Sequence, residues 1–224
     1  MSAQKSVLMV VTSHDRIDDA HPTGLWFEEF AVPFQMFHDA GLRIAVASPK
    51  GGAVPIDPRS MPENTEASEV KAALDVLANT ASLASVDLDA FDAVFFPGGH
   101  GTMYDLPDNP QVAKLVGQFA DADKVVASVC HGPASLVGAT LADGTPVVKG
   151  RRVTAFTNEE EAAVELDKLM PFLLESRLRE LGAQVETAAQ WADHVIVDGK
   201  LVTGQNPQSS ASAAKAVIAL LATS

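Results

Sequence analysis

Cysteine and basic residues are scarce in this sequence. Cys130 is the one cysteine among 224 residues, which excludes an intrachain disulfide and a cysteine-based zinc cluster. A lone thiol is typical of a reducing compartment, so we expect a cytoplasmic protein. The 16 basic residues against 29 acidic ones leave a net charge of −13, which repels nucleic acids and anionic membranes. We therefore expect neither as a partner.

Long apolar runs are also missing. The first apolar stretch, residues 7–11, gives way to polar residues at 12–15 without a small-residue cleavage site, so it is too short for a signal peptide. No stretch approaches the roughly eighteen apolar residues of a membrane-spanning helix. The composition, 47% hydrophobic, is that of an ordinary globular protein, and we interpret residues 1–224 as a single domain.

Short runs rich in Val, Ile and Phe alternate with helical patterns, which is typical of βαβ units and a mostly parallel sheet covered on both faces. The Asp198–Gly199 pair between two such runs is typical of a hairpin, so one sheet edge should be antiparallel. The expected strands are residues 7–12, 44–47, 93–96, 125–129, 152–156, 184–187, 195–197 and 201–203. The expected helices are residues 25–40, 70–77, 110–122, 134–137, 159–166, 172–181 and 210–221.

Cys130 directly follows the expected strand 125–129 and precedes a helical pattern. Ligands bind at the carboxyl ends of strands in open α/β sheets, and Gly132 leaves room for the sharp turn of a nucleophile elbow. The positive end of a helix lowers the pKa of a thiol placed there, and each pKa unit of lowering favours the thiolate by about 1.4 kcal/mol. A free cysteine can instead be a small buried hydrophobic residue. The strand–helix junction favours an exposed, strained nucleophile.

A turn of Pro97, Gly98 and Gly99 ends another expected strand at the same edge of the sheet. The backbone N–H groups of the two glycines, with that of His131, could form an oxyanion hole, although such a turn is often only a turn. The segment is neither a Walker A loop nor a dinucleotide fingerprint, because it lacks the residues that those motifs require.

Candidate acids and bases surround the thiol in the sequence. His131 can meet its neighbour Cys130 only if the turn between them is not helical, and it could instead cap the helix. Glu28 and Glu29 open the expected helix 25–40, where carboxylates suit the helix dipole, and only one of them can face inward.

Three consecutive acids, Glu159, Glu160 and Glu161, also open a helix, where a solvated acidic first turn would explain them equally well. No metal site is expected, because the remaining histidines do not fall at a ligand spacing such as i, i+4 on one helix. These histidines are His14, His21, His38, His100 and His194.

Six segments occurring in one order resemble the PfpI/ThiJ superfamily, of the class I glutamine amidotransferase-like fold, and within it the small heat-shock chaperone and glyoxalase III branch. They are residues 24–29, 48–52, 97–101, 129–134, 150–161 and 203–207. The resemblance covers nearly the whole chain and implies a homodimer of flavodoxin-like α/β domains, each a doubly wound, mostly parallel sheet between helices. Glutamine amidotransferases of related fold carry a His–x–Glu pair downstream of the cysteine, whereas His194 is followed by Val195 and Ile196. Glutaminase chemistry is therefore not expected.

The resemblance also implies site residues. Its glutamate precedes a proline by four positions, which selects Glu29 before Pro33. Its third triad acid follows a Phe–Thr pair, which selects Glu161 while leaving Glu159 and Glu160 open. The implied catalytic residues are Cys130, His131, Glu29 and Glu161, and the implied oxyanion donors are Gly99 and His131.

The implied activity is conversion of methylglyoxal or a similar 2-oxoaldehyde to a 2-hydroxy acid, without glutathione or another cofactor. If Glu29 contacts the Cys130 sulfur, the two groups should share one proton near neutral pH. Three alternatives are a holdase chaperone, a redox sensor oxidised to sulfinate, and a cysteine peptidase or deglycase of the PfpI type. The convergence of a strained cysteine, acids and oxyanion donors favours the glyoxalase.

Overall fold

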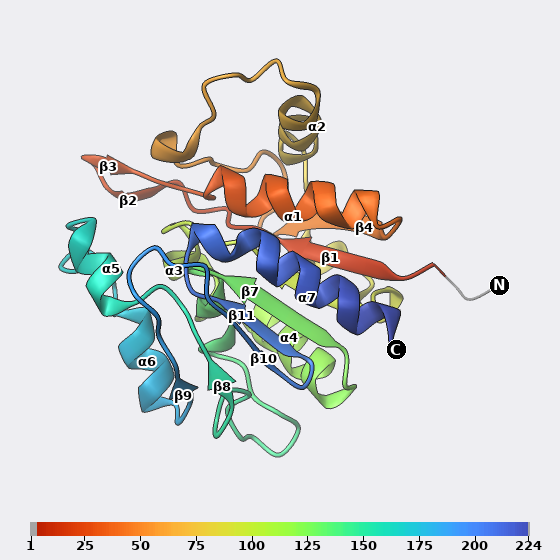
Figure 1. Cartoon of the computed structure of the whole chain (residues 1–224), viewed down its shortest axis with the longest axis vertical. Coiled ribbons are helices and arrows are strands. Elements are labelled where there is room, and N and C mark those ends of the chain that lie inside the picture. Colours follow the sequence, from red (N-terminus) through yellow and green to blue (C-terminus); the bar gives the residue numbers. More distant parts are fainter. Residues whose placement is uncertain (1–3, 224) are drawn as a thin grey trace.

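A seven-stranded sheet forms the centre of the computed structural model, which describes residues 4–223 (Figure 1). Its strands are β1 (Ser6–Val10), β4 (Arg43–Ser48), β5 (Ala81–Ser82), β6 (Ala93–Phe96), β7 (Val125–Val129), β10 (Val195–Asp198) and β11 (Leu201–Gly204). They lie in the order β10-β11-β7-β6-β1-β4-β5, and every pairing is parallel except that of β10 with β11. The predicted flavodoxin-like sheet with one antiparallel edge is confirmed.

The strands are apolar throughout because both faces of the sheet are covered. In β1, Val7 and Met9 belong to one hydrophobic cluster, and Leu8 and Val10 belong to the other. This division follows from the period of two residues along a strand. The two clusters hold the central strands in place, so the ends of the strands are a rigid platform for side chains.

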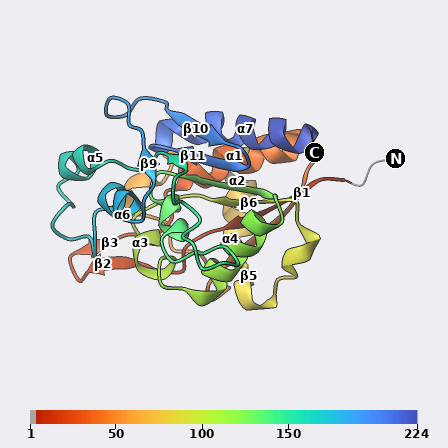
Figure 2. The same ribbon diagram turned by 90° about the horizontal axis from the view of Figure 1, so that it is seen from below.

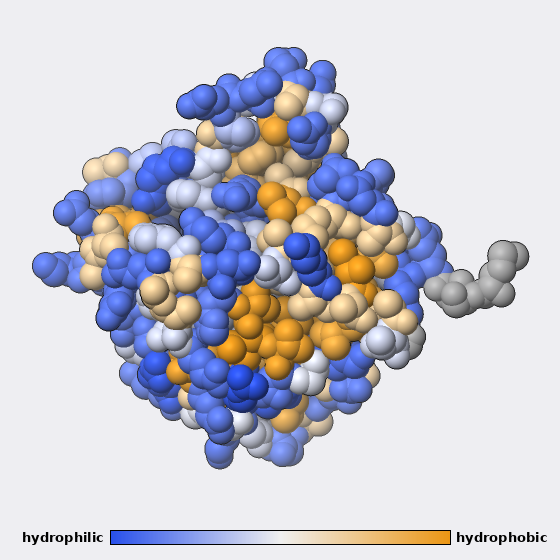
Figure 3. Space-filling view, in the orientation of Figure 1, coloured by the Kyte–Doolittle hydropathy of each residue, from blue (hydrophilic) through white to orange (hydrophobic). Residues whose placement is uncertain are grey.

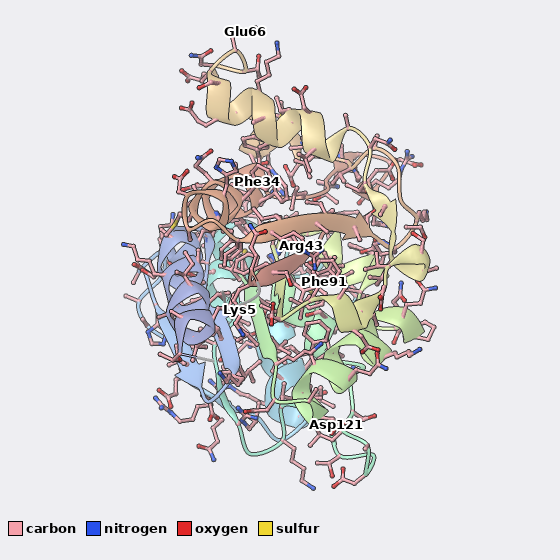
Figure 4. All side chains as sticks on the ribbon, turned by 90° about the vertical axis from the view of Figure 1, so that its right-hand side faces the viewer. Lys5, Phe34, Arg43, Glu66, Phe91 and Asp121 are labelled. Atoms are coloured by element: carbon pink, nitrogen blue, oxygen red, sulfur yellow. The ribbon has the colours of Figure 1, made fainter. Side chains whose placement is uncertain are left out.

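Helices cover the two faces of the sheet (Figure 2). The helices are α1 (Phe27–Asp39), α2 (Ser68–Leu77), α3 (Thr102–Asp105), α4 (Pro110–Asp121), α5 (Asn158–Ala163), α6 (Leu174–Glu180) and α7 (Ser210–Ala222). Helices α1 and α7 lie on one face of the sheet and α4 lies on the other. Helix α2 packs on the outer side of α1, and Glu66, just before α2 in the chain, lies far from the sheet (Figure 4). None of the helices in residues 4–223 is long and apolar enough to cross a bilayer.

Two small sheets stand apart from the central one. They are β2 (Arg16–Asp18) with β3 (His21–Pro22), and β8 (Arg152–Val153) with β9 (Gln184–Val185). The predicted strands 152–156 and 184–187 are therefore too long, and they do not join the main sheet. The chain leaves β8 at once, because Thr154 N–H donates to the Thr203 hydroxyl and Phe156 N–H donates to the Cys130 carbonyl.

The segment after Cys130 also differs from the prediction. Residues Gly132–Leu136 form a 3₁₀ helix of five residues, where a helix over 134–137 was expected. Such a short helix has poorer hydrogen-bond geometry than an α-helix and supplies less of an oriented dipole.

Candidate active site

Cys130 lies in a sharp turn at the carboxyl end of β7. Its φ of 61° falls in the left-handed region, which non-glycine residues adopt only when their surroundings impose it. Cys130 N–H donates to the Gly204 carbonyl and Phe156 N–H donates to the Cys130 carbonyl, each at 2.9 Å. A Cβ on Gly132 would lie 2.1 Å from Phe96 O, so the turn requires glycine there. The elbow geometry is present, but the thiol is buried, with Cys130 3% exposed, and not exposed as predicted.

The carboxyl of Glu29 reaches this turn from the start of α1. Glu29 is fully buried, whereas Glu28 is exposed, so Glu29 is the member of the pair that faces inward. Its Oε2 accepts a hydrogen bond from Gly98 N–H at 2.7 Å, and a Cβ on Gly98 would lie 2.6 Å from the same oxygen. Its Oε1 is buried without a well-formed hydrogen bond, and the Cys130 thiol interacts with this carboxyl.

The buried Glu29 carboxyl and Cys130 thiol each make ionisation of the other less favourable. Burial raises the pKa of Glu29 to about 8, so at neutral pH the carboxyl is mostly protonated, on Oε1 because Oε2 accepts Gly98 N–H. Burial also raises the pKa of the Cys130 thiol, and a charge on Glu29 raises it further. Near neutral pH both groups are therefore mainly protonated, so the pair holds two protons and not the single shared proton that was predicted. The predicted lowering of the thiol pKa is wrong, because the thiol is buried and only a short 3₁₀ helix follows it.

His131 connects the thiol to a carboxylate. Its Nδ1 lies 3.4 Å from Cys130 Sγ, and its Nε2 lies 2.7 Å from Glu161 Oε2. Burial alone would raise the pKa of Glu161, but the charge of His131 and the hydrogen bonds from two histidines hold it well below its usual value. Because the ionised carboxyl can only accept, the neutral form of His131 carries its proton on Nε2 and presents the Nδ1 lone pair to the sulfur. This is the arrangement of a cysteine–histidine–acid triad.

The first turn of α5 distinguishes the three consecutive glutamates. Glu159 is exposed, and Glu160 is buried with its carboxylate turned away from the histidine. Glu161 is the one that contacts His131. The carboxylate of Glu160 accepts hydrogen bonds from Thr157 N–H, the Thr157 hydroxyl, Trp191 N–H, the Gln205 amide and the Asn206 amide.

Two further residues, neither of them predicted as a site residue from the sequence, extend this network. His100 Nε2 lies 2.7 Å from Glu161 Oε1, and His100 Nδ1 lies 3.3 Å from Arg59 Nη2. A guanidinium only donates, so Nδ1 accepts and Nε2 carries the proton toward Glu161. Burial, with the charge of His131, lowers the pKa of His100 to about 4, so this ring is neutral. Arg59 is itself held by Asp57, at 2.9 and 2.6 Å.

The sequence contained a partial signal for these two residues. His100 stands in the Pro97–Gly98–Gly99–His100–Gly101 motif, which could have prompted a role for its ring. Arg59 stands in an irregular segment, in a 3₁₀ turn over Pro58–Ser60, with no motif to mark it.

A metal ion could in principle use some of the same atoms. Ligand atoms of His100, His131 and Glu161 lie within 4.8 Å of one another. Both histidines, however, lie at hydrogen-bond distance from the Glu161 carboxylate, so their Nε2 atoms carry protons and are engaged in the network. The residues present fit a proton network better than a metal centre.

Two neighbouring loops beside Cys130 carry backbone donors that lack an acceptor within residues 4–223. Among the hydrogen bonds of residues 4–223, the N–H groups of Gly99 and His131 have no acceptor. The two loops approach closely, since a Cβ on Gly98 would lie 2.7 Å from His131 N. The prediction that Gly98 joins this group is wrong, because its N–H donates to Glu29. Gly99 and His131 remain as free donors of the kind that stabilises an oxyanion.

The thiol opens into a pocket of about 180 Å³. Its walls are mainly aromatic and aliphatic, which suits a small uncharged substrate. The lining residues are Trp26, Arg59, Gly99, His100, Cys130, His131, Phe156, Val164, Trp191 and Pro207.

Comparison with known proteins shows what this architecture is similar to. The DJ-1/PfpI family matches residues 24–220. The chain belongs to the DJ-1/PfpI family. A family relative named as a glutathione-independent glyoxalase, from Schizosaccharomyces pombe, is 32% identical over 236 residues, covering 97% of this chain and 96% of its own length.

Two solved structures share the fold of this chain over nearly its whole length. Glyoxalase III from Candida albicans superposes with a TM-score of 0.88 at 28% identity, covering 96% of this chain and 97% of its own. The 24 kDa rapid encystment protein of Francisella tularensis superposes with a TM-score of 0.92 at 36% identity, covering 97% of this chain and 99% of its own. The family resemblance inferred from the sequence motifs is confirmed.

Proposed function

We propose that this chain is a glutathione-independent glyoxalase of the glyoxalase III type, which converts methylglyoxal or a related 2-oxoaldehyde to a 2-hydroxy acid. The observation that carries the proposal is that Cys130 and His131 line one small pocket, with Glu161 bonded to His131 and a protonated Glu29 beside the thiol. The names of the Schizosaccharomyces pombe and Candida albicans relatives support it. An aldehyde carbon accepts a thiolate without help from a cofactor.

The first step forms a carbon–sulfur bond. The thiol proton passes to His131 Nδ1, 3.4 Å from Sγ, as the sulfur adds to the aldehyde carbon. The imidazolium is stabilised by Glu161 at 2.7 Å. The aldehyde oxygen becomes an oxyanion, which the N–H groups of Gly99 and His131 stabilise.

The second step moves hydrogen within the substrate. The Glu29 carboxyl, protonated on Oε1, gives its proton to the neighbouring ketone oxygen, and its carboxylate form removes the proton from the former aldehyde carbon. An enediolate results, and return of that proton to the second carbon, with collapse of the oxyanion, gives a thioester of Cys130. Water then cleaves the thioester, its hydroxyl going to the acyl carbon and its proton to the sulfur, which releases the 2-hydroxy acid and restores the thiol. The proton that the His131 imidazolium took from the thiol passes to the Glu29 carboxylate, so both groups return to their starting states. The net change is addition of one water, with no external oxidant or reductant.

The test is formation of D-lactate from methylglyoxal in the absence of glutathione. We expect turnover by the wild-type protein and a loss of at least about 10³-fold in Cys130→Ser, because a serine at this site lacks the nucleophile of the triad. Ser212→Ala, at an exposed hydroxyl on α7 that bonds Asp193, is the matched control and should retain wild-type rates. Circular dichroism should show that both variants are folded. Equal turnover by Cys130→Ser and wild type would overturn the proposal.

Burial of the thiol also separates the glyoxalase from the redox sensor. Peroxide oxidises exposed thiolates, whereas Cys130 is 3% exposed and burial raises its pKa. These properties favour attack on a substrate bound beside His131 over reaction with peroxide from solvent.

The hydrogen bond from His100 should support the triad through Glu161. In His100→Leu the Nε2–H donor is lost, so the Glu161 carboxylate loses one of the two hydrogen bonds from histidines that hold it in place beside His131. A hydrogen bond to a charged group is worth about 1.5–3 kcal/mol, which predicts a roughly 10- to 100-fold loss of kcat/KM. His100→Gln keeps a donor and should lose less. Equal kcat/KM values for His100→Leu, His100→Gln and the wild type would show that Glu161 does not depend on His100.

Assembly and compartment are part of the same proposal. The chain acts as one domain in a homodimer, in keeping with the family resemblance and with the apolar residues that gather over α1 and α7 (Figure 3). It acts in the cytoplasm, in keeping with its single free cysteine. Nucleic acids and membranes are not partners, in keeping with the net charge of −13.

A further inference from the structure

We propose that the pocket is built for 2-oxoaldehydes that carry an aromatic or comparably bulky apolar substituent, and that Trp191 is the residue that selects them. The inference rests on the proposed function, since it concerns the substrate of the same Cys130 site. It gives a role to the side of the pocket that lies away from the Cys130 thiol. A three-carbon substrate would not need that side of the pocket for its chemistry.

The size of the pocket is the first observation. Its volume is about 180 Å³, whereas an apolar cavity of roughly 150 Å³ already holds a benzene molecule. A three-carbon oxoaldehyde bonded to Cys130 would leave much of this space unfilled. A phenyl ring on the ketone carbon fits within it.

The chemistry of the walls is the second observation. The Phe156 ring lies 4.4 Å from the His131 ring and 5.7 Å from the Trp191 ring, measured between centroids. These rings lead from the catalytic histidine outward along one wall, and Val164 and Pro207 add aliphatic surface. A planar apolar substituent can stack on such a wall.

The charged side chains beside this wall are largely engaged. The Glu161 carboxylate is held by two histidines, and the Nε and Nη2 atoms of Arg59 donate to Asp57 and His100. The Phe156, Val164 and Pro207 side chains offer no polar partner, so a hydroxylated substituent that lies on them would lose water without gaining a hydrogen bond. The walls select against polar substituents and in favour of apolar ones.

The placement of Trp191 is the third observation. It is 39% exposed, one of three large hydrophobic residues in 4–223 that are so exposed, and its φ of 63° is left-handed. The backbone N–H of Trp191 donates to the buried Glu160 carboxylate at 2.9 Å. The side-chain amides of Gln205 and Asn206 donate to the same carboxylate. A strained backbone anchored to a buried charge, carrying a half-exposed indole at a pocket, indicates a binding surface and not a core residue.

The test compares kcat/KM for phenylglyoxal with kcat/KM for methylglyoxal. Both are taken from initial rates, before the substrates can modify arginine side chains of the protein. The readout is the phenylglyoxal-to-methylglyoxal ratio in each protein, because the intrinsic reactivities cancel when ratios are compared between proteins. We expect the ratio to fall at least about 10-fold in Trp191→Ala, the usual effect of losing a well-fitted apolar contact. The fall should lie mainly in KM, with kcat for methylglyoxal changed less than about 3-fold, because the ring is bound equally before and during reaction.

Two other variants bracket this result. Trp191→Phe keeps an aromatic wall and should retain the ratio within about 3-fold. Val197→Ala shortens another exposed apolar side chain, 43% exposed and outside the pocket, and should match the wild type. Should Trp191→Ala fail to fold, calorimetry on the wild-type protein gives the answer without it: mandelate, the product expected from phenylglyoxal, should bind at least about 10-fold more tightly than lactate.

The outcomes separate this inference from the proposed function. Turnover of both substrates with one ratio in the wild type and in Trp191→Ala would overturn the inference and leave the glyoxalase intact. Equal binding of mandelate and lactate would also overturn it. Absence of turnover with either substrate, together with tighter binding of mandelate, would overturn the proposed function and leave the apolar pocket standing.

Discussion

Glu29→Gln should make the protein nearly inactive and, at neutral pH, more stable. Proton transfer by a positioned acid or base is worth about 10²- to 10⁴-fold, so we expect kcat with methylglyoxal to fall by roughly 10³-fold. An amide can still accept Gly98 N–H through its oxygen, so the local structure should survive. Lactate formation measures the first effect.

The stability gain follows from the pKa of Glu29, which rises from 4.5 to about 8 on burial. Between these values the folded protein holds a proton that the unfolded chain has released, so wild-type stability falls as pH rises through this window. At about 1.4 kcal/mol per pKa unit, the free energy of unfolding should drop by roughly 2–3 kcal/mol between pH 5 and pH 7. Glu29→Gln lacks this drop, and urea unfolding at the two pH values measures it.

Glu28→Gln is the matched control, because it makes the same chemical change at an exposed position of the same helix turn. Its unfolding free energy should follow the wild type at both pH values. A constant difference between Glu29→Gln and wild type from pH 5 to pH 7 would contradict the raised pKa. Loss of activity together with a gain of stability in Glu29→Gln would show that the buried Glu29 carboxyl destabilises the fold while it is needed for catalysis.

Glu160→Ala should be the most destabilising substitution near the site. The Glu160 carboxylate accepts five hydrogen bonds, from Thr157, Trp191, Gln205 and Asn206, and all of these donors lie at least partly out of reach of water. Removing one partner of a buried charged network costs about 3–5 kcal/mol, because the remaining groups are left unpaired. For a chain of this size we expect Tm to fall on the order of 10 °C.

Glu159→Ala provides the comparison, since Glu159 precedes Glu160 in the same helix turn and is exposed. Its Tm should lie within about 2 °C of the wild type, as for most surface changes. Thermal unfolding followed by circular dichroism measures both. Similar Tm values for Glu159→Ala and Glu160→Ala would show that the network around Glu160 contributes little to stability.

Much of the fold was predictable because local patterning governs it. The runs of β1, β6 and β7 are apolar at every position, and strands buried on both faces carry this signal in any arrangement. The Asp198–Gly199 pair correctly predicted the antiparallel edge formed by β10 and β11. The predictions failed at 152–156, where hydrogen bonds to Cys130 and Thr203, distant in sequence, override the local preference for a strand.

The proximity of the candidate site residues was predictable, and their electrostatics were not. Cys130, His131 and Glu29 came from motif positions, and each lies where a shared site requires. The thiol pKa was predicted to fall from a helix that proves to be a short 3₁₀ turn, whereas burial raises it. Desolvation depends on what the rest of the chain covers, which no local pattern contains.

The sequence by itself determined the type of each main element, the position of the nucleophile after its strand, and the glycines that the turns need. These depend on neighbours in the chain. The tertiary structure alone decided that Glu161, among three consecutive glutamates, meets His131, that Gly98 N–H serves Glu29, and that Arg59, His100 and Trp191 join the site. The physical reason is that a hydrogen bond requires partners within about 3 Å, and only packing of distant segments brings them that close.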